Sequence, residues 1–175
     1  MPGMPSKVNF LGHAVHPMLV AFPIGLLTMV PVFDIARFAT HDPMFGDVSF
    51  WMLTCGAAGA LLAALPGLVD FLGIPGGTRA QRVALTHLVV NLTAALLFIA
   101  SWLIRLTVGI PVIGVAAFVV GLAGLCALAV GGWLGGELVE RHGLTVSPQA
   151  NLDASSSLTP TPTPFGPRPT SPQPV

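Results

Sequence analysis

The sequence predicts an all-α fold, a bundle of four transmembrane helices followed by a disordered C-terminal tail. Of its 175 residues, 53% are hydrophobic and only 8% are charged, whereas a soluble domain carries about a quarter charged residues. Four long runs without a charged residue lie at 8–33, 48–69, 83–104 and 106–136. About 20 apolar residues suffice for a helix to cross a hydrocarbon core of about 30 Å. Each run therefore predicts one crossing, and lipid leaves helices as the only structure for it.

The first two spans are predicted near 17–37 and 49–72, within a transmembrane domain that covers 1–146. Pro17 can begin the first helix, because a proline at the first helical position loses no helical hydrogen bond. Asp47 or Ser49 is expected to cap the second helix, since both side chains accept hydrogen bonds from free backbone N–H groups.

The other two spans are predicted near 80–105 and 111–137. Thr78 is expected to cap the third helix, and Gly143 is a stop signal after the fourth. Eight of the 29 residues in the segment 147–175 are proline. Such a segment cannot bury a core, so it is predicted to be a disordered tail rich in Pro, Ser and Thr.

Positive charges near the helix ends predict the orientation. One side of the membrane would carry Lys7, Arg79, Arg82 and Arg141, and the other Arg37 and Arg105. By the positive-inside rule, both termini of this multi-pass protein would lie in the cytoplasm. The seven basic and seven acidic residues balance, which argues against nucleic acid as a partner.

Most of the histidines are expected at one side of the membrane. Four crossings place these residues there together with two carboxylates: His13, His16, His87, His142, Asp70 and Glu137. The third span also has one polar face, formed by His87, Asn91, Ala94, Phe98, Ser101 and Arg105. Polar side chains in membrane helices point into the bundle, so His87 is predicted to face neighbouring helices.

Small residues share one face of the second span: Gly56, Gly59 and Ala63, with Asp70 on the same face. Such a face predicts either close helix packing or room for a flat macrocycle. Glycines near the end of the fourth span allow the same two interpretations: Gly131, Gly132, Gly135 and Gly136.

Several segments also resemble a known family. They are LGHAVHPMLVAFPIGL at 11–26, FW at 50–51, LPGLVDF at 65–71, Thr86-His87, and GGELVERHGLTV at 135–146. Together with Asp34, and in this order, they are similar to the domain-of-unknown-function family 2231 over about residues 10–146. The resemblance implies a small bacterial membrane protein with four helices and no assigned biochemical role. Relatives fused to Rieske-type or cytochrome-type domains imply a link to electron transfer.

The first functional hypothesis is a b-type haem held by two histidines from different helices. His87 is the preferred ligand, with His16 or His142 as its partner and His13 a weaker candidate. The chain would then be a redox-associated membrane subunit with redox partner proteins. No nucleophile–base pair or phosphate-binding loop is present, so the sequence does not predict an enzyme acting alone.

Three alternatives stay open. A non-haem metal site would use the histidines His13, His16, His87 and His142 with Asp70 or Glu137. Proton-linked transport would use the polar face between His87 and Arg105. A structural or partner-binding protein, including a homo-oligomer, would need only the lipid bilayer and its ion pairs. Those pairs are predicted as Asp34 with Arg37 or Arg105, and Asp70 with Arg79 or Arg82.

Overall fold

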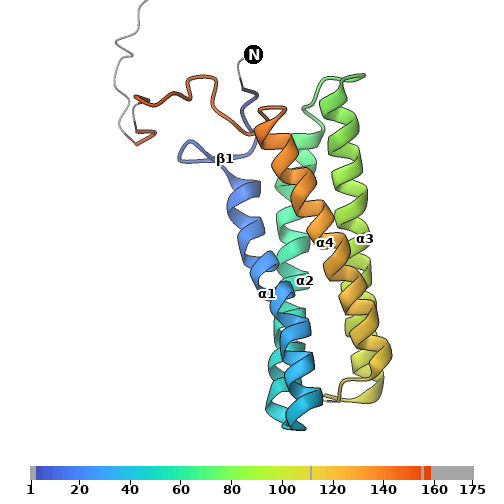
Figure 1. The fold of residues 1–175 in the computed structure, drawn as a ribbon. Helices are drawn as coiled ribbons and strands as arrows, with labels where there is room; N and C mark the ends of the chain where they lie inside the picture. The colour runs from blue at the N-terminus through green and yellow to red at the C-terminus, as the bar shows by residue number, and fades with distance from the viewer. Residues whose placement is uncertain (1–2, 111, 155, 159–175) are drawn as a thin grey trace, which may run out of the picture.

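A computed structural model describes residues 3–110, 112–154 and 156–158. This part of the chain contains a short hairpin of β1 (Asn9–Phe10) and β2 (His13–Ala14), followed by four helices. The helices are α1 (Val15–Thr40), α2 (Pro43–Phe71), α3 (Arg79–Val108) and α4 (Val115–Glu140). All four are long and apolar enough to cross a membrane. The predicted four-helix fold is therefore confirmed (Figure 1).

Some helix ends follow their expected local chemistry, and two helix starts, those of α1 and α2, are corrected by the structure. Thr78 caps α3 as predicted, since its hydroxyl accepts a hydrogen bond from the Gln81 backbone N–H at 3.1 Å. The cap of α2 was predicted at Asp47 or Ser49 but is Asp42, which accepts from the Met44 N–H at 2.9 Å. Pro43 follows this cap, at a position where proline costs no hydrogen bond. The helix therefore begins earlier than expected.

The start of α1 and the end of α4 are the remaining boundaries that the sequence predicted. Pro17 was predicted to begin α1, but the helix begins at Val15, and Pro17 is its third residue, still in the first turn, where no intrahelical donor is needed. Gly143 follows α4 with a φ of 64°, a left-handed conformation that favours glycine. The prediction of a disordered tail falls mainly on residue 155 and on 159–175, which lie outside the described residues.

The four helices form two antiparallel hairpins, α1 with α2 and α3 with α4, and each hairpin is packed more closely within itself than against the other (Figure 1). Glycines allow the close approach inside each hairpin. A methyl group at Gly56 would lie 2.7 Å from the Leu27 side chain, and one at Gly124 would lie 3.3 Å from Phe98. These contacts support the packing interpretation of the small-residue face on the second span.

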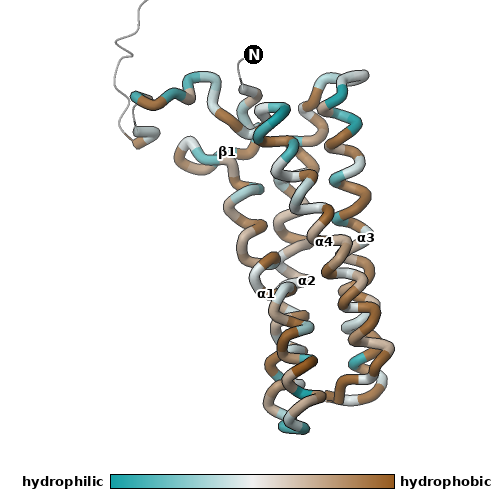
Figure 2. The backbone as a smooth tube through the Cα atoms, viewed as in Figure 1, coloured by the Kyte–Doolittle hydropathy of each residue, from teal (hydrophilic) through white to brown (hydrophobic). Residues whose placement is uncertain are grey.

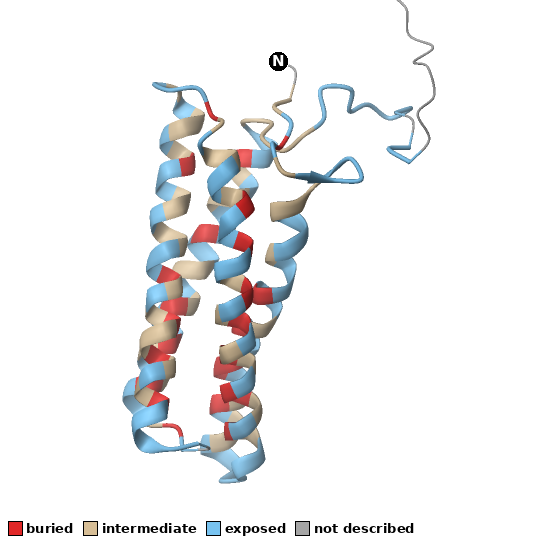
Figure 3. Cartoon of the chain, turned by 180° about the vertical axis from the view of Figure 1, so that it is seen from behind, coloured by how far each residue is buried: buried red, intermediate tan, exposed pale blue. Residues whose placement is uncertain are grey.

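Apolar side chains cover the outside of the bundle. Hydrophobic residues extend along the helices, and hydrophilic ones gather toward their ends (Figure 2). The buried residues lie instead on the helix faces turned toward one another (Figure 3). Large exposed side chains such as Trp51, Leu62 and Trp133 are more than 60% exposed. Lipid is the environment in which such a surface is stable.

Candidate functional site

Two of the predicted site histidines lie together between the hairpins. His16 is in the first turn of α1, and His87 lies about two turns into α3. Their ring centroids are 6.5 Å apart, and the ring planes are inclined by 87°. Both side chains are half-buried. The structure thus brings His87 next to His16 rather than next to His142.

A main-chain carbonyl of the adjacent helix fixes each ring. His16 Nδ1 lies 2.8 Å from the Ala63 carbonyl oxygen on α2, and His87 Nδ1 lies 2.9 Å from that of Gly131 on α4. A carbonyl oxygen can only accept, so each Nδ1 carries the proton and donates it. In the neutral imidazole, Nε2 then keeps its lone pair, which is the form that ligates a metal.

Glycine makes room for both rings. A methyl group at Gly67 would lie 2.8 Å from Cε1 of His16, and one at Gly135 would lie 3.1 Å from Cε1 of His87. Any larger residue would therefore move the ring it faces. Gly135 was among the glycines that the sequence singled out, whereas Gly67 was missed. Its spacing of four residues from Ala63 places it on the same helix face and was the available signal.

The carboxylates among the candidate residues are occupied elsewhere. Asp70 accepts hydrogen bonds from the Ser6 hydroxyl at 2.8 and 2.9 Å and from the Lys7 N–H at 2.7 Å. The expected pairing of Asp70 with Arg79 or Arg82 is therefore wrong in the described residues. Glu137 instead lies 3.9 Å from Arg141, one helical turn away.

The remaining histidine candidates lie apart from the pair. His13 is exposed in β2, with its Nε2 3.4 Å from the Ser157 hydroxyl. His142 follows the end of α4 and is half-buried. Within 3–110, 112–154 and 156–158, no three His, Cys, Asp or Glu residues are grouped so that they could hold a metal ion. The histidine pair is thus the candidate site that this part of the chain presents.

The opposite end of the bundle holds a buried ion pair. Arg105 of α3 donates to both carboxylate oxygens of Asp34 on α1, at 2.6 and 3.0 Å. The two side chains are 2% and 1% exposed. Of the two partners predicted for Asp34, the structure selects Arg105 over Arg37. Ser49, expected as a helix cap, donates to Asp34 at 2.5 Å and lies 3.1 Å from the guanidinium.

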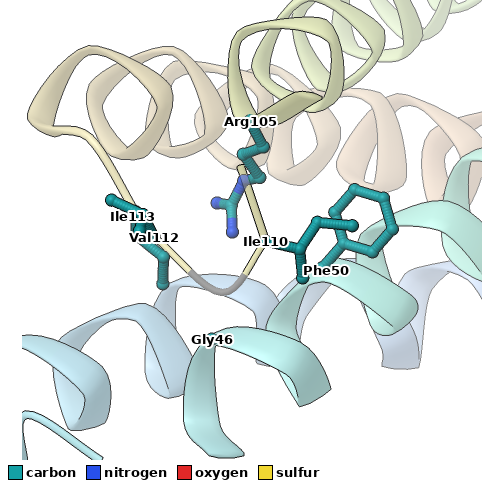
Figure 4. Close-up of a pocket in the computed structure, with 6 residues that line it drawn as sticks. All are labelled: Gly46, Phe50, Arg105, Ile110, Val112 and Ile113. Atoms are coloured by element: carbon teal, nitrogen blue, oxygen red, sulfur yellow. The ribbon is translucent and has the colours of Figure 1, made fainter. Parts of the chain in front are cut away.

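A small pocket adjoins this ion pair, and Figure 4 shows the Arg105 guanidinium extending from α3 toward the α1–α2 hairpin. Its lining is otherwise without charge: Gly46, Phe50, Ile110, Val112 and Ile113. Because both Asp34 oxygens already bind the guanidinium, Arg105 is engaged with the protein itself. Its role at this end is to join the two hairpins.

About one helical turn along α3 from Arg105, a third polar contact joins the hairpins. The Trp102 indole N–H of α3 donates to the Thr54 hydroxyl of α2 at 2.9 Å. Apolar packing surrounds it, with Leu27, Val30, Leu53 and Phe98 forming one buried cluster. The residues of this cluster lie along their helices between the histidine pair and the ion pair.

These features define the class of protein: four apolar helices around a largely uncharged interior form a multi-pass membrane protein. A family model described as "Predicted membrane protein (DUF2231)" matches residues 12–148, and the chain belongs to that family. This confirms the resemblance found in the sequence. The comparisons with curated proteins and with solved structures gave no match.

Proposed function

We propose that the protein is a redox-associated membrane subunit that binds one b-type haem between His16 and His87. The spacing of the two rings carries this proposal. Metal–imidazole bonds are about 2.05 Å long and a ring centroid lies about 1.2 Å behind its nitrogen, so one metal shared by two opposed imidazoles separates their centroids by about 6.5 Å. The observed centroids are 6.5 Å apart.

The number of protein ligands favours haem over a bare metal ion. A porphyrin supplies the four equatorial nitrogens of its iron, so the protein needs to provide only two axial imidazoles. A zinc site uses three or four protein ligands. In the described residues the two imidazoles have no third His, Cys, Asp or Glu grouped with them. A pair of histidines is therefore a sufficient donor set for haem and an insufficient one for zinc.

The residues around the pair would orient these ligands. The carbonyls of Ala63 and Gly131 hold each Nδ1–H, which fixes the tautomer and increases the basicity of Nε2. Gly67 and Gly135 leave the space in which the rings are held. A haem bound here would supply one-electron transfer. The chain would then pass electrons between redox partner proteins, with no substrate-converting chemistry of its own.

The proposed location is a bacterial inner membrane with both termini in the cytoplasm. The end of the bundle where α1 begins and α4 ends carries Lys7, Arg79, Arg82 and Arg141. The burial of Arg105 in its ion pair supports this orientation, because it leaves Arg37 as the remaining basic residue near the other end of the described helices. A reporter fused after residue 146 should give a cytoplasmic signal, and a periplasmic signal would reverse the assignment.

The haem proposal is tested by a reduced-minus-oxidised spectrum of the full-length protein, purified after expression with haem supplied. The wild type should give a b-type band, and His16→Ala and His87→Ala should each abolish or shift it. The matched controls, His13→Ala and His142→Ala, should keep it. A wild type without a haem band, or one whose band survives both ligand substitutions, would overturn the proposal. The structural and partner-binding role would then be favoured.

A further inference from the structure

The two hairpins correspond to one another position by position. Between α1 and α3, 71 positions separate His16 from His87, and the same number separates Asp34 from Arg105. The buried positions follow the same offset. On α1 they include Pro23, Leu27, Val30 and Asp34, and on α3 they are matched by Ala94, Phe98, Ser101 and Arg105. The two helices therefore bury the same face at the same height.

The second helix of each hairpin repeats this correspondence with an offset of 68 positions. The buried residues Ser49, Leu53, Gly56 and Ala63 of α2 are matched by the buried residues Ala117, Gly121, Gly124 and Gly131 of α4. The offset is constant over several turns of both helices. A chance match between the buried faces of α2 and α4 would not also keep α2 in the same axial position relative to α1 as α4 has relative to α3.

Individual contacts recur at these matched positions. Gly56 packs on Leu27 in one hairpin, and Gly124 packs on Phe98 in the other. The His16 Nδ1 binds the Ala63 carbonyl, and the His87 Nδ1 binds that of Gly131. Finally, Gly67 faces the His16 ring as Gly135 faces the His87 ring. Each hairpin thus holds its histidine through a carbonyl and a glycine at equivalent positions.

The matched helices α1 and α3 run in the same direction, because each is followed by an antiparallel helix and a return loop (Figure 1). A two-fold axis along the bundle therefore relates the hairpins. The direct contacts between α1 and α3 at the two ends join residues that are each other's equivalents: His16 with His87, and Asp34 with Arg105. A contact between two equivalent residues lies on the axis itself.

We infer that the protein is built from two copies of one helical hairpin and that its ligand site lies on their two-fold axis. Asp34 and Arg105 are the positioning residues that set this site. Placed at equivalent positions, their unlike charges pair only when the hairpins are in this register, and that register brings the two imidazoles next to one another, with centroids 6.5 Å apart. The assignment of a ligand to the site rests on the proposed haem function, whereas the two-fold arrangement does not.

The exchange variant D34R/R105D tests the inference, because two-fold equivalent positions should tolerate the exchange of their residues. We expect its haem content to remain within about twofold of the wild type, since the buried pair is kept. D34R alone places two guanidiniums on the axis and should lower haem content by about tenfold or more. The control exchange E137R/R141E, at a partly exposed pair away from the proposed axis, should leave haem content unchanged. Equal losses in D34R/R105D and D34R would overturn the two-fold assignment.

A second variant separates positioning from stability. D34L/R105M replaces the pair by apolar residues, a change that buried ion pairs often tolerate without loss of stability. We expect its helical circular dichroism to be retained while the ferric EPR signal, which depends on the angle between the two axial imidazole planes, shifts or broadens. An unchanged EPR signal and unchanged haem content would overturn the positioning role.

A measurement that needs no haem keeps the two proposals distinguishable. In full-length H16C/H87C without its native cysteines (Cys55→Ala, Cys126→Ala), a short bis-maleimide should link the hairpins. The yield should persist when D34R/R105D is added and fall about tenfold with D34R alone. This pattern without any haem band in the wild type would refute the haem proposal and support the two-fold arrangement. A haem band in the wild type without this cross-linking pattern would support the haem proposal and refute the two-fold arrangement.

Discussion

At one end of the bundle Asp34 and Arg105 meet with their polar atoms engaged, whereas at the other end His16 and His87 meet with only Nδ1 of each ring in a described hydrogen bond. The ion pair is at most 2% exposed, and the imidazoles are half-buried. Both contacts join α1 to α3. The same helix pair therefore carries one contact in which the charged groups bind each other. It also carries a second contact in which the Nε2 atom of each imidazole keeps a lone pair that could bind a ligand.

This difference indicates where the free energy of folding and where the binding chemistry are concentrated. A buried charge without its partner is costly in a low-dielectric interior. Asp34 and Arg105 must therefore remain paired for the bundle to stay folded. A neutral imidazole costs far less to leave partly unpaired. The histidine end can therefore remain open to a ligand without unfolding the bundle. Each of the following predictions compares these two ends.

The largest effect is expected at the ion-pair end. Arg105→Met leaves the Asp34 carboxylate buried without its cation and should lower the free energy of unfolding by about 3–5 kcal/mol. Denaturation in detergent, followed by circular dichroism, measures this loss. Arg141→Met is the control, because Arg141 is 74% exposed and its ion pair contributes little. Similar losses in both variants would contradict the contrast between buried and exposed pairs.

A smaller effect is expected from crowding the histidine end. Gly67→Ala should cost about 1–3 kcal/mol, because its methyl group would lie 2.8 Å from the His16 ring, and Gly135→Ala should cost less at 3.1 Å. Gly136→Ala, where a methyl group meets nothing within 4 Å, should stabilise the helix by up to about 1 kcal/mol. Thermal unfolding in detergent ranks the three, and a Gly67→Ala variant as stable as Gly136→Ala would refute the close fit.

The hydrogen bond between Trp102 and Thr54, about one turn from the ion pair, should contribute less still. Trp102→Phe removes the indole donor to Thr54 and should cost about 1 kcal/mol, and Thr54→Val should cost a similar amount. In the double variant the two losses should not add, because both substitutions remove the same hydrogen bond. A double-mutant cycle measures this coupling. Fully additive losses would show that the two side chains act independently.

The smallest effect is expected from the histidines in the protein without haem. His87→Ala removes one hydrogen bond to a helical carbonyl and should lower the free energy of unfolding by about 0.5–1 kcal/mol. The Gly131 carbonyl stays within a helix, so the substitution strands no buried charge. Denaturation of haem-free protein measures the loss. A loss as large as that of Arg105→Met would show that His87 is mainly structural.

Composition and periodicity were sufficient to predict the four helices, because long uncharged runs have one stable form in lipid. The polar face of the third span was equally readable. Its members Ala94, Phe98, Ser101 and Arg105 are the buried residues of α3 beyond its first turns. The start of α2 was not, since Asp42, Asp47 and Ser49 all have cap chemistry. Ser49 could be assigned only once its buried hydrogen bond to Asp34 was seen.

The sequence could not determine which side chains on different helices contact one another. His16 and His142 were both open partners for His87, because the number of crossings fixes a side of the membrane but not how each helix is rotated. Arg37 and Arg105 were likewise both within reach of Asp34. The hydrogen bonds of Asp70 depend on the path of the N-terminal segment, which carries no periodic signal. Haem, metal and redox partners stay predictions.

The groups that orient the two imidazoles belong to the main chain, and this has a consequence for variation of the sequence. Every amino acid in a helix presents the same carbonyl, so no replacement at positions 63 or 131 can delete the acceptor. Substitutions there alter the room beside the rings and leave the polarity that directs them intact. The orientation of the two rings thus depends on main-chain groups. Substitutions at positions 63 and 131 would change the packing around the rings before they changed the direction in which the rings point.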